Sequence, residues 1–261
     1  MTNLIFSFDD GRKDNLEVVL EILAPNNIPA TFNLTTDYIS NNLEEKEQPC
    51  KNEALSIGDI YKIKDLNMFE FAGHGKKHSN EFQNLIDGVL ELRSMLQIES
   101  IVGIASPNSQ ADIDVVLKDE GMYRECKVSY FRLGDRSSPF NEVKKIIRKV
   151  NRKFFHIPFI YSLVHKHSLI STKDEFILYS IPVLHSDSIA EIVSIIRTAV
   201  KLDKSIILMF HSILKKDRDN YISPWSWDWH KFNELILIVK EMESSGMLRI
   251  TTTSDFVRSG R

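Results

Sequence analysis

The chain has 261 residues, 43% of them hydrophobic and 26% charged, which is an ordinary soluble globular composition. Its formal net charge of −3 provides no strong basic field, so neither nucleic acid nor an anionic membrane is an expected partner. The two cysteines, Cys50 and Cys126, are far apart and form no CxxC pattern, which argues against a disulfide framework or a cysteine zinc site.

The N-terminal stretch "MTNLIFSF" lacks the features of a secretory signal. It has no basic region, no long apolar core and no cleavage site, and the chain contains no apolar run of 18 residues. We therefore expect a cytoplasmic protein that does not span a membrane.

Short apolar runs alternate with helical periodicity along the whole chain. The first half predicts a strand at 4–8, a helical stripe of Leu16, Val19, Leu20 and Leu23, a strand at 30–34, a polar loop at 40–52, a helix at 56–66, a strand at 69–72, a helix at 84–97 and a strand at 101–105. The second half predicts a helix at 113–120, a strand at 127–131, a basic amphipathic helix at 141–153 with a solvated charged face, a strand at 176–181, a helix at 189–200, a strand at 205–210, a helix at 232–244 and a strand at 248–251.

Alternating strands and helices predict an α/β protein with a mostly parallel sheet. At this length a complete or distorted (β/α) barrel is the leading expectation, and a doubly wound open sheet is the alternative. We expect residues 1–261 to form a single domain, with a polar loop or insertion around 40–53.

Three of the predicted strands end in polar groups that suit chemistry. Asp9 and Asp10 end the first strand, His74 and His78 follow "FEFAG", and His211 follows "SIILMF". Because the carboxyl ends of parallel strands meet at one end of a barrel, we expect these five side chains to lie close together.

The adjacent acids Asp9 and Asp10 pose a physical problem, since like charges this close repel and burying either without a partner is costly. A cation should therefore lie beside them. His74 and His78 are four residues apart, so on a helix both imidazoles could reach one metal ion. One carboxylate and two imidazoles leave positions for water and suit a catalytic zinc site. Each motif alone is weak evidence: an HxxxH pair is more often two solvated histidines, and adjacent acids often form a cap or turn.

The segments "SFDDG" (7–11), "GHGKKH" (73–78) and "LMFHS" (208–212) resemble motifs one, two and five of the polysaccharide deacetylases of carbohydrate esterase family 4, and they occur in the family's order. The resemblance implies a distorted (β/α) barrel, a divalent metal that is commonly zinc, and removal of acetyl groups from N-acetylated sugars. By position it implies Asp9 as general base, Asp10, His74 and His78 as metal ligands, and His211 as the general acid that protonates the leaving amine. The metal would offset the charge of both acids.

The third motif of that family normally supplies an arginine that orients the base, followed by a proline. The counterpart here is "GIASPNS" (103–109), in which Pro107 fits and is expected at the substrate site, with a simple loop turn as the alternative. Ala105, however, stands where the arginine would be. Arg132 or Arg136, in "YFRLGDR", is the candidate replacement.

The fourth motif, which normally flanks the acid histidine with an aspartate and a tryptophan, has no clear counterpart. The segment "SPWSWDWHKF" contains Trp225, Trp227 and Trp229. We expect Trp227 and Trp229 to contact substrate, as a wall for an acetyl group or a platform for a sugar ring. The alternative is that they pack the rim of the barrel.

The leading hypothesis is a metal-dependent deacetylase acting on an N-acetylated sugar or glycan intermediate in surface polysaccharide biosynthesis, such as O-antigen or capsule. One alternative is an amidohydrolase acting on a non-sugar amide. Another is a binding protein that retains the metal without turnover, which the absent arginine at Ala105 favours.

Overall fold

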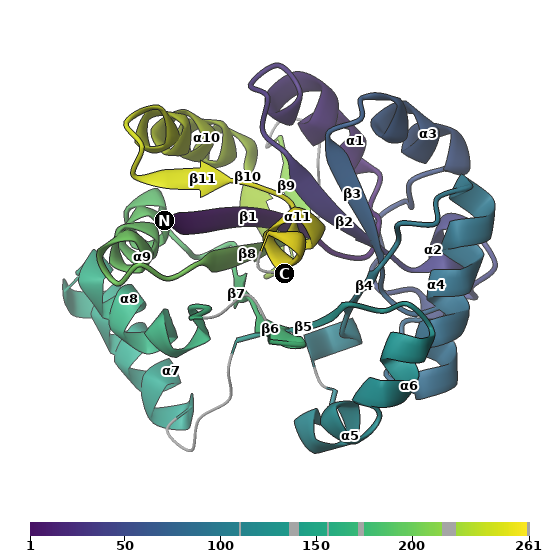
Figure 1. The fold of residues 1–261 in the computed structure, drawn as a ribbon. Helices are drawn as coiled ribbons and strands as arrows, with labels where there is room; N and C mark the ends of the chain where they lie inside the picture. The colour runs from purple at the N-terminus through teal and green to yellow at the C-terminus, as the bar shows by residue number, and fades with distance from the viewer. Residues whose placement is uncertain (110, 136–140, 156, 172–174, 216–222, 260–261) are drawn as a thin grey trace.

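A ring of parallel strands lies inside a ring of helices in the computed structural model, which describes residues 1–109, 111–135, 141–155, 157–171, 175–215 and 223–259 (Figure 1). Along the sheet the strands follow the order β6-β5-β4-β3-β2-β1-β8-β7, and β11 also pairs with β1. The strands are β1 (Thr2–Phe8), β2 (Ala30–Leu34), β3 (Phe69–Gly73), β4 (Gly103–Ala105), β5 (Tyr130–Leu133), β6 (Ile177–Tyr179), β7 (Ile181–Pro182), β8 (Ile206–Phe210), β9 (Ser212–Leu214), β10 (Ser226–Asp228) and β11 (Leu248–Ile250).

The two ends of the sheet meet at one short segment of the chain, so the barrel is nearly closed. β6 pairs in parallel with β5, and directly after Ser180 the chain continues as β7, which pairs in parallel with β8. The sheet therefore returns on itself. This confirms the predicted distorted (β/α) barrel and excludes the open doubly wound sheet.

The helices surround this ring, and several begin at residues that satisfy their first backbone N–H groups. Ser56 with Asp59, and Ser188 with Glu191, form capping boxes at the starts of α3 and α9. No helix in the described part of the chain is long and apolar enough to cross a bilayer. The helices are α1 (Asp14–Val18), which continues as a π-helix (Val19–Leu23), α2 (Thr36–Ile39), α3 (Ile57–Asp65), α4 (Phe82–Leu96), α5 (Ile113–Lys118), α6 (Glu120–Glu125), α7 (Asn141–Val150), α8 (Pro158–His165), α9 (Ile189–Lys201), α10 (Trp229–Ser244) and α11 (Thr253–Arg258).

The buried face of the first helix differs from the predicted apolar stripe. Leu20 is exposed, whereas Asn15, Val18 and Ile22 are buried. Asn15 turns inward because its side-chain amide donates a hydrogen bond to the backbone carbonyl of His211, at 2.9 Å. Apolar periodicity alone cannot identify a buried position that is held by a polar contact.

The barrel interior is apolar at the amino ends of the strands. Five strand residues form a small apolar cluster there with Ile170, and α11, which lies over the middle of the ring in Figure 1, adds Phe256 and Val257. Because side chains alternate along a strand, the inward positions of β1 continue from the apolar Ile5 to the polar Ser7. The strand residues of the cluster are Ile5, Ala72, Tyr130, Leu178 and Ile207.

β5 lies two to three residues later in the sequence than predicted. The predicted strand ended at residue 131, but the observed strand runs over Tyr130–Leu133 and includes Arg132. Arg132 is only 1% exposed, and its guanidinium pairs with Asp9 inside the barrel. A charged residue can occupy a buried strand position when its counter-ion is buried with it.

Gly103 should tolerate no side chain, because the ring of Tyr130 fills the space beside it. A Cβ added at Gly103 would lie 1.9 Å from Cζ of Tyr130, whose hydroxyl is held by a hydrogen bond to Glu70 at 2.7 Å. We expect Gly103→Ala to lower the free energy of unfolding by about 1–3 kcal/mol, measured by urea denaturation. Gly121→Ala is the matched control, since no atom lies within 4 Å of its added Cβ. Equal stability of Gly103→Ala and wild type would contradict this packing.

Candidate active site

The structure brings together the five side chains that were predicted from the strand ends. They line one pocket of about 160 Å³ at the carboxyl ends of the strands. These residues are Asp9, Asp10, His74, His78 and His211, and the lining is completed by Arg12, Pro49, Asn108, Ser109, Met209 and Trp225.

Asp9 and Asp10 both reach the pocket because the chain turns sharply after β1. Neighbouring residues of a strand point to opposite faces, but Asp10 has a left-handed backbone with φ of 77°, and Gly11 follows with φ of 88°. A Cβ at Gly11 would lie 2.9 Å from a methyl carbon of Leu34, so both the backbone conformation and the space favour glycine.

Asp10 is paired with an arginine of its own. Arg12 donates to Oδ2 of Asp10 from Nε at 2.9 Å and from Nη2 at 2.7 Å, and both residues are buried. Burial raises the pKa of Asp10, but the Arg12 guanidinium outweighs it and holds that pKa well below its ordinary value. Asp10 is therefore a carboxylate, with Oδ1 turned toward the histidines.

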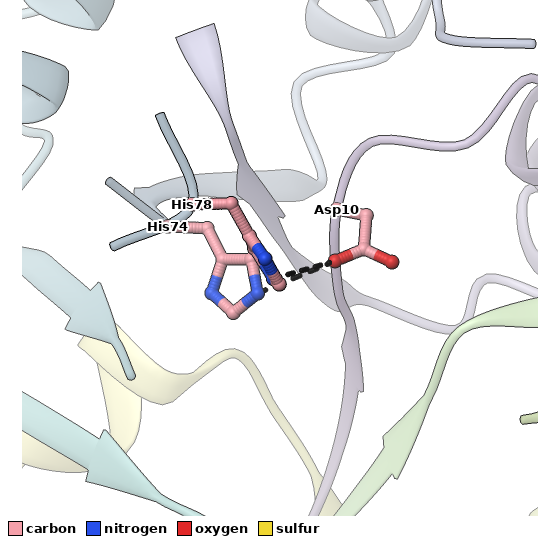
Figure 2. Close-up of side chains that lie close together, drawn as sticks. All are labelled: Asp10, His74 and His78. Atoms are coloured by element: carbon pink, nitrogen blue, oxygen red, sulfur yellow. Dashed lines mark ion pairs between the residues drawn. The ribbon is translucent and has the colours of Figure 1, made fainter. Parts of the chain in front are cut away.

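Both imidazoles approach the same oxygen of Asp10 (Figure 2). The Nε2 atoms of His74 and His78 each lie 3.4 Å from Oδ1 of Asp10. A tetrahedral ion with bonds of about 2.1 Å would separate its ligand atoms by about 3.4 Å. These distances therefore fit a small divalent cation.

The hydrogen bonding of His74 supports the same conclusion. Its Nδ1 lies 3.0 Å from the backbone carbonyl oxygen of Ala105, and since a carbonyl can only accept, Nδ1 carries the proton. In the neutral ring, Nε2 then presents a lone pair to the carboxylate of Asp10. Two electron-rich atoms at this distance repel, and a cation between them turns the repulsion into attraction. This is the one cluster of metal-ligating side chains found within the described ranges.

His74 and His78 do not lie on a helix, as their spacing had suggested. After β3 the chain forms a loop in which Gly75 and His78 have left-handed backbones, with φ of 79° and 53°. Asn84 of α4 fixes this loop, since its side chain accepts from the N–H of Lys77 at 2.8 Å and donates to the carbonyl of Ser79 at 2.7 Å. The two imidazoles are thus brought together by a curled loop that is tied to α4.

Asp9 pairs with Arg132. Nη2 of Arg132 lies 2.7 Å and 2.6 Å from the two carboxylate oxygens, and its Nη1 donates to Ser180 at 2.7 Å. Asn33 donates a further hydrogen bond to Asp9 at 2.8 Å. Burial raises the pKa of Asp9, but the Arg132 guanidinium outweighs it and sets that pKa below its ordinary value. Asp9 is therefore ionised and fixed in orientation.

Arg132 stands beside the position at which the third motif lacks its arginine. In the parallel pairing of β4 and β5, Ala105 is the direct partner of Arg132. The guanidinium is thus provided by the next strand along. The other candidate, Arg136, lies outside the described residues.

His211 follows β8 and packs against the ring of Trp225, with the ring centres 4.9 Å apart. Burial lowers the pKa of His211 to about 4, although the carboxylates Asp10 and Asp9 oppose this shift. Its Nδ1 is buried and has no hydrogen-bond partner among the described residues. The imidazole is therefore neutral at pH 7.

Neither Trp227 nor Trp229 lies in the pocket lining. Trp227 is 1% exposed, and its Nε1 donates to the backbone carbonyl of Asp187 at 3.0 Å. Trp229 is half-buried, and the ammonium of Lys215 lies 4.0 Å from its ring centre. Both tryptophans pack the rim of the barrel, which was the alternative prediction, whereas Trp225 is 43% exposed and lines the pocket.

Pro107 is buried beside the pocket rather than in its lining. Its backbone carbonyl accepts a hydrogen bond from Asn80 at 2.9 Å. The next two residues, Asn108 and Ser109, line the pocket and have left-handed backbones with φ of 52° and 55°. The turn-forming sequence "SPNS" was the signal that could have identified them.

A groove of about 670 Å³ adjoins the pocket and shares Arg12, Pro49 and Trp225 with it. Its remaining lining comes from Ser223 and from the loop that the sequence marked as a polar insertion: Glu44, Glu45, Lys46, Gln48, Cys50 and Lys51. This loop therefore forms one wall of the approach to the site. The sequence analysis did not predict Arg12 as a site residue, although its position two residues after Asp10 could have identified it.

The sequence matches no protein-family model and no curated protein. Solved structures do match. A family 4 carbohydrate esterase from Bacillus anthracis aligns over 99% of this chain and 83% of its own, with a TM-score of 0.50 and 12% identity. The chain has the fold of a family 4 carbohydrate esterase.

Two further structures are similar to the chain. A family 4 carbohydrate esterase from Streptomyces lividans, in complex with acetate, aligns over 95% of this chain and 91% of its own, with a TM-score of 0.47 and 10% identity. The Streptococcus pyogenes deacetylase PplD, in complex with acetate, aligns over 49% of this chain and 54% of its own, with a TM-score of 0.41 and 18% identity. The match to PplD thus spans about half the length of that protein.

Removing a ligand side chain should remove the metal ion and leave the barrel intact. We expect Asp10→Ala and His78→Ala to lose a bound divalent cation, measured by elemental analysis of the purified protein, with circular dichroism unchanged. Asp9→Asn is the matched control and should keep the metal, because Asp9 faces Arg132. Full metal occupancy in both ligand variants would contradict the assignment.

Proposed function

We propose that the protein is a metal-dependent hydrolase that removes acetyl groups from N-acetylated sugars, in the making of a surface polysaccharide such as O-antigen or capsule. One arrangement carries this proposal. Asp10, His74 and His78 have the spacing that a divalent cation requires, and the ionised Asp9 lies beside them in the same pocket.

Zinc is the cation we propose, because two imidazoles and one carboxylate suit it. Held by Asp10, His74 and His78, it would polarise the acetyl carbonyl and acidify the attacking water. Asp9 is ionised and therefore able to accept the proton of that water. Arg132 contacts both of its carboxylate oxygens and so fixes the direction from which Asp9 takes the proton.

The leaving amine needs a proton when its bond to the acetyl carbon breaks. The resemblance to family 4 implies that His211 supplies it, but His211 is neutral at pH 7, and a cation bound nearby would lower its pKa further. Asp9 holds the proton taken from water. We therefore assign proton return to Asp9, and to His211 a hydrogen bond from a neutral imidazole to the leaving group.

The groove beside the pocket supports a substrate larger than one sugar. The pocket of about 160 Å³ has room for an acetyl group and part of its sugar, and the adjoining 670 Å³ can take further sugar units or a carrier. Trp225 lines both spaces with an exposed ring, on which the apolar face of a sugar can stack.

The case for a binding protein without turnover rested on the arginine missing at Ala105. In the sheet, Arg132 is the direct partner of Ala105 on the next strand, and it pairs with Asp9. The missing arginine at Ala105 is therefore no longer an argument for a binding protein. No observation favours the alternative amidohydrolase on a non-sugar amide, which the assay below distinguishes.

The test is acetate release from a panel of N-acetylated mono- and oligosaccharides, with protein loaded with zinc and protein treated with a chelator. We expect zinc-dependent acetate release that is faster with oligosaccharides. Ammonia release or ring opening of a cyclic amide, without acetate release, would support the amidohydrolase instead. Glycan binding with metal bound and no turnover would support the binding protein.

Arg132→Ala should lower kcat/KM by about 100-fold while metal content stays at the wild-type level, because Asp9 loses the contact that orients it. Adding Ala105→Arg to Arg132→Ala should restore part of the activity, since the two positions are direct partners in the sheet. Wild-type kinetics in Arg132→Ala, measured on the best substrate of the panel, would contradict the orienting role.

The pH profile of kcat/KM should show no titration of His211 between pH 6 and 8. Because the folded protein lowers the pKa of His211 to about 4, its imidazole has already lost its proton throughout this range. His211→Ala should lower kcat/KM by roughly 10²-fold at every pH in the range. If the wild-type rate fell above pH 7 and this fall vanished in His211→Ala, His211 would be a protonated acid after all.

A further inference from the structure

Helix α7 turns its apolar side to solvent, the reverse of an ordinary surface helix. Four apolar residues recur at helical spacing along it, at positions i, i+3, i+4 and i+7. Their side chains are 41–61% exposed: Val143, Ile146, Ile147 and Val150.

Polar contacts hold α7 in this orientation. The Arg148 guanidinium pairs with the buried carboxylate of Asp187 and lies 4.7 Å from the ring centre of Tyr161. Just beyond the helix, the side-chain amide of Asn151 is 2% exposed and both donates to and accepts from the backbone of Ile157, at 3.0 Å each. The inward side of α7 is thus specified by its polar residues, which leaves the apolar side unpartnered.

Exposed apolar residues also follow α7 in the chain, as far as the next helix. Figure 1 shows α7 and α8 next to each other at the outer edge of the molecule. Nine of the 21 exposed large hydrophobic residues in the described part of the chain fall between positions 143 and 163, and such a concentration marks an interaction surface. We call these nine the α7–α8 patch: Val143, Ile146, Ile147, Val150, Phe154, Phe155, Ile157, Phe159 and Leu163.

The segment that carries this patch is strongly basic. Residues 141–153 contain six lysines or arginines and a single glutamate, a net charge of +5 in a chain whose total is −3. Among them, Lys149 and Lys153 are exposed next to the apolar residues. The net charge of the whole chain is negative, so an anionic membrane was not an expected partner. That total conceals the positive charge of this one segment.

We propose that the α7–α8 patch docks on an anionic lipid bilayer, with α7 lying in the plane of the headgroups. Branched apolar side chains on one side of a basic helix, with exposed phenylalanines in the segments that follow it, suit the boundary between headgroups and acyl chains. A second copy of the chain fits less well, because a symmetric contact would bring two segments of charge +5 together.

The patch is attached to the end of the barrel that carries the site. Arg148 anchors α7 to Asp187, which follows β7 at the carboxyl ends of the strands. The backbone carbonyl of Asp187 also accepts from Trp227 of β10, at the rim of the barrel. Docking would therefore hold this end of the barrel next to the bilayer surface.

Co-sedimentation with lipid vesicles tests the proposal. We expect the full chain to bind vesicles that contain phosphatidylserine, to bind phosphatidylcholine vesicles weakly, and to dissociate as salt is raised. Ile146→Ser with Phe154→Ser should lower the partition constant by about tenfold or more, and Lys149→Glu with Lys153→Glu should abolish the preference for phosphatidylserine. All four positions are exposed, so thermal unfolding should stay as in wild type.

The matched control is Leu202→Ser with Leu237→Ser, which removes exposed leucines elsewhere and should leave vesicle binding unchanged. No binding of wild type to phosphatidylserine vesicles would overturn the proposal, as would equal binding by wild type and the Ile146/Phe154 variant. A dimer in light scattering that this variant dissociates, without vesicle binding, would make the patch an interface between copies. Binding to polyglutamate but not to vesicles would point to an acidic protein partner, and either result refutes the membrane assignment.

Discussion

Two carboxylates from adjacent residues are buried at one end of the barrel, and each stays ionised because it has its own arginine. Asp9 pairs with Arg132 from β5, and Asp10 pairs with Arg12 from the turn after β1. Loss of one partner from such a buried pair typically costs roughly 3–5 kcal/mol, because an unpaired charge remains. The separate pairing also gives the two acids different surroundings: Asp9 is held by Arg132, as its proposed role in proton transfer requires, and Asp10 is turned toward the histidines.

The sequence predicted the polar residues that follow the strands, but it did not decide which arginine pairs with Asp9. Asp9, Asp10 and His211 follow apolar runs, so their shared location could be inferred from the parallel sheet alone. The arginine that orients Asp9 could only be narrowed to Arg132 or Arg136, and the strand before them was predicted to end at residue 131. Arg132 can be buried because its charge is paired with Asp9, which lies 123 positions away in the sequence.

The spacing of residue types along the chain also does not determine which way the side chains point. Trp225, Trp227 and Trp229 alternate as if on one face of a strand, but β10 includes only Trp227, and α10 begins at Trp229, so the three rings diverge. In α7 the spacing of apolar residues shows that the helix is amphipathic, yet Arg148 decides which side faces the protein. Closure of the barrel likewise depends on β6 and β7 pairing with different neighbours, which the pattern of one strand cannot show.

The hydrogen bonds from Arg12 limit what Asp10 can offer to a metal ion. Two donors of Arg12 occupy Oδ2, so Asp10 presents one ligand atom, Oδ1, and cannot chelate with both oxygens. Calcium takes about 6–8 oxygen ligands and often a bidentate carboxylate, and magnesium requires a near-octahedral shell that is rich in oxygen. A set of one oxygen and two imidazole nitrogens meets neither demand. At the proposed metal site, Arg12 would therefore favour ions of low coordination number over the abundant alkaline-earth cations.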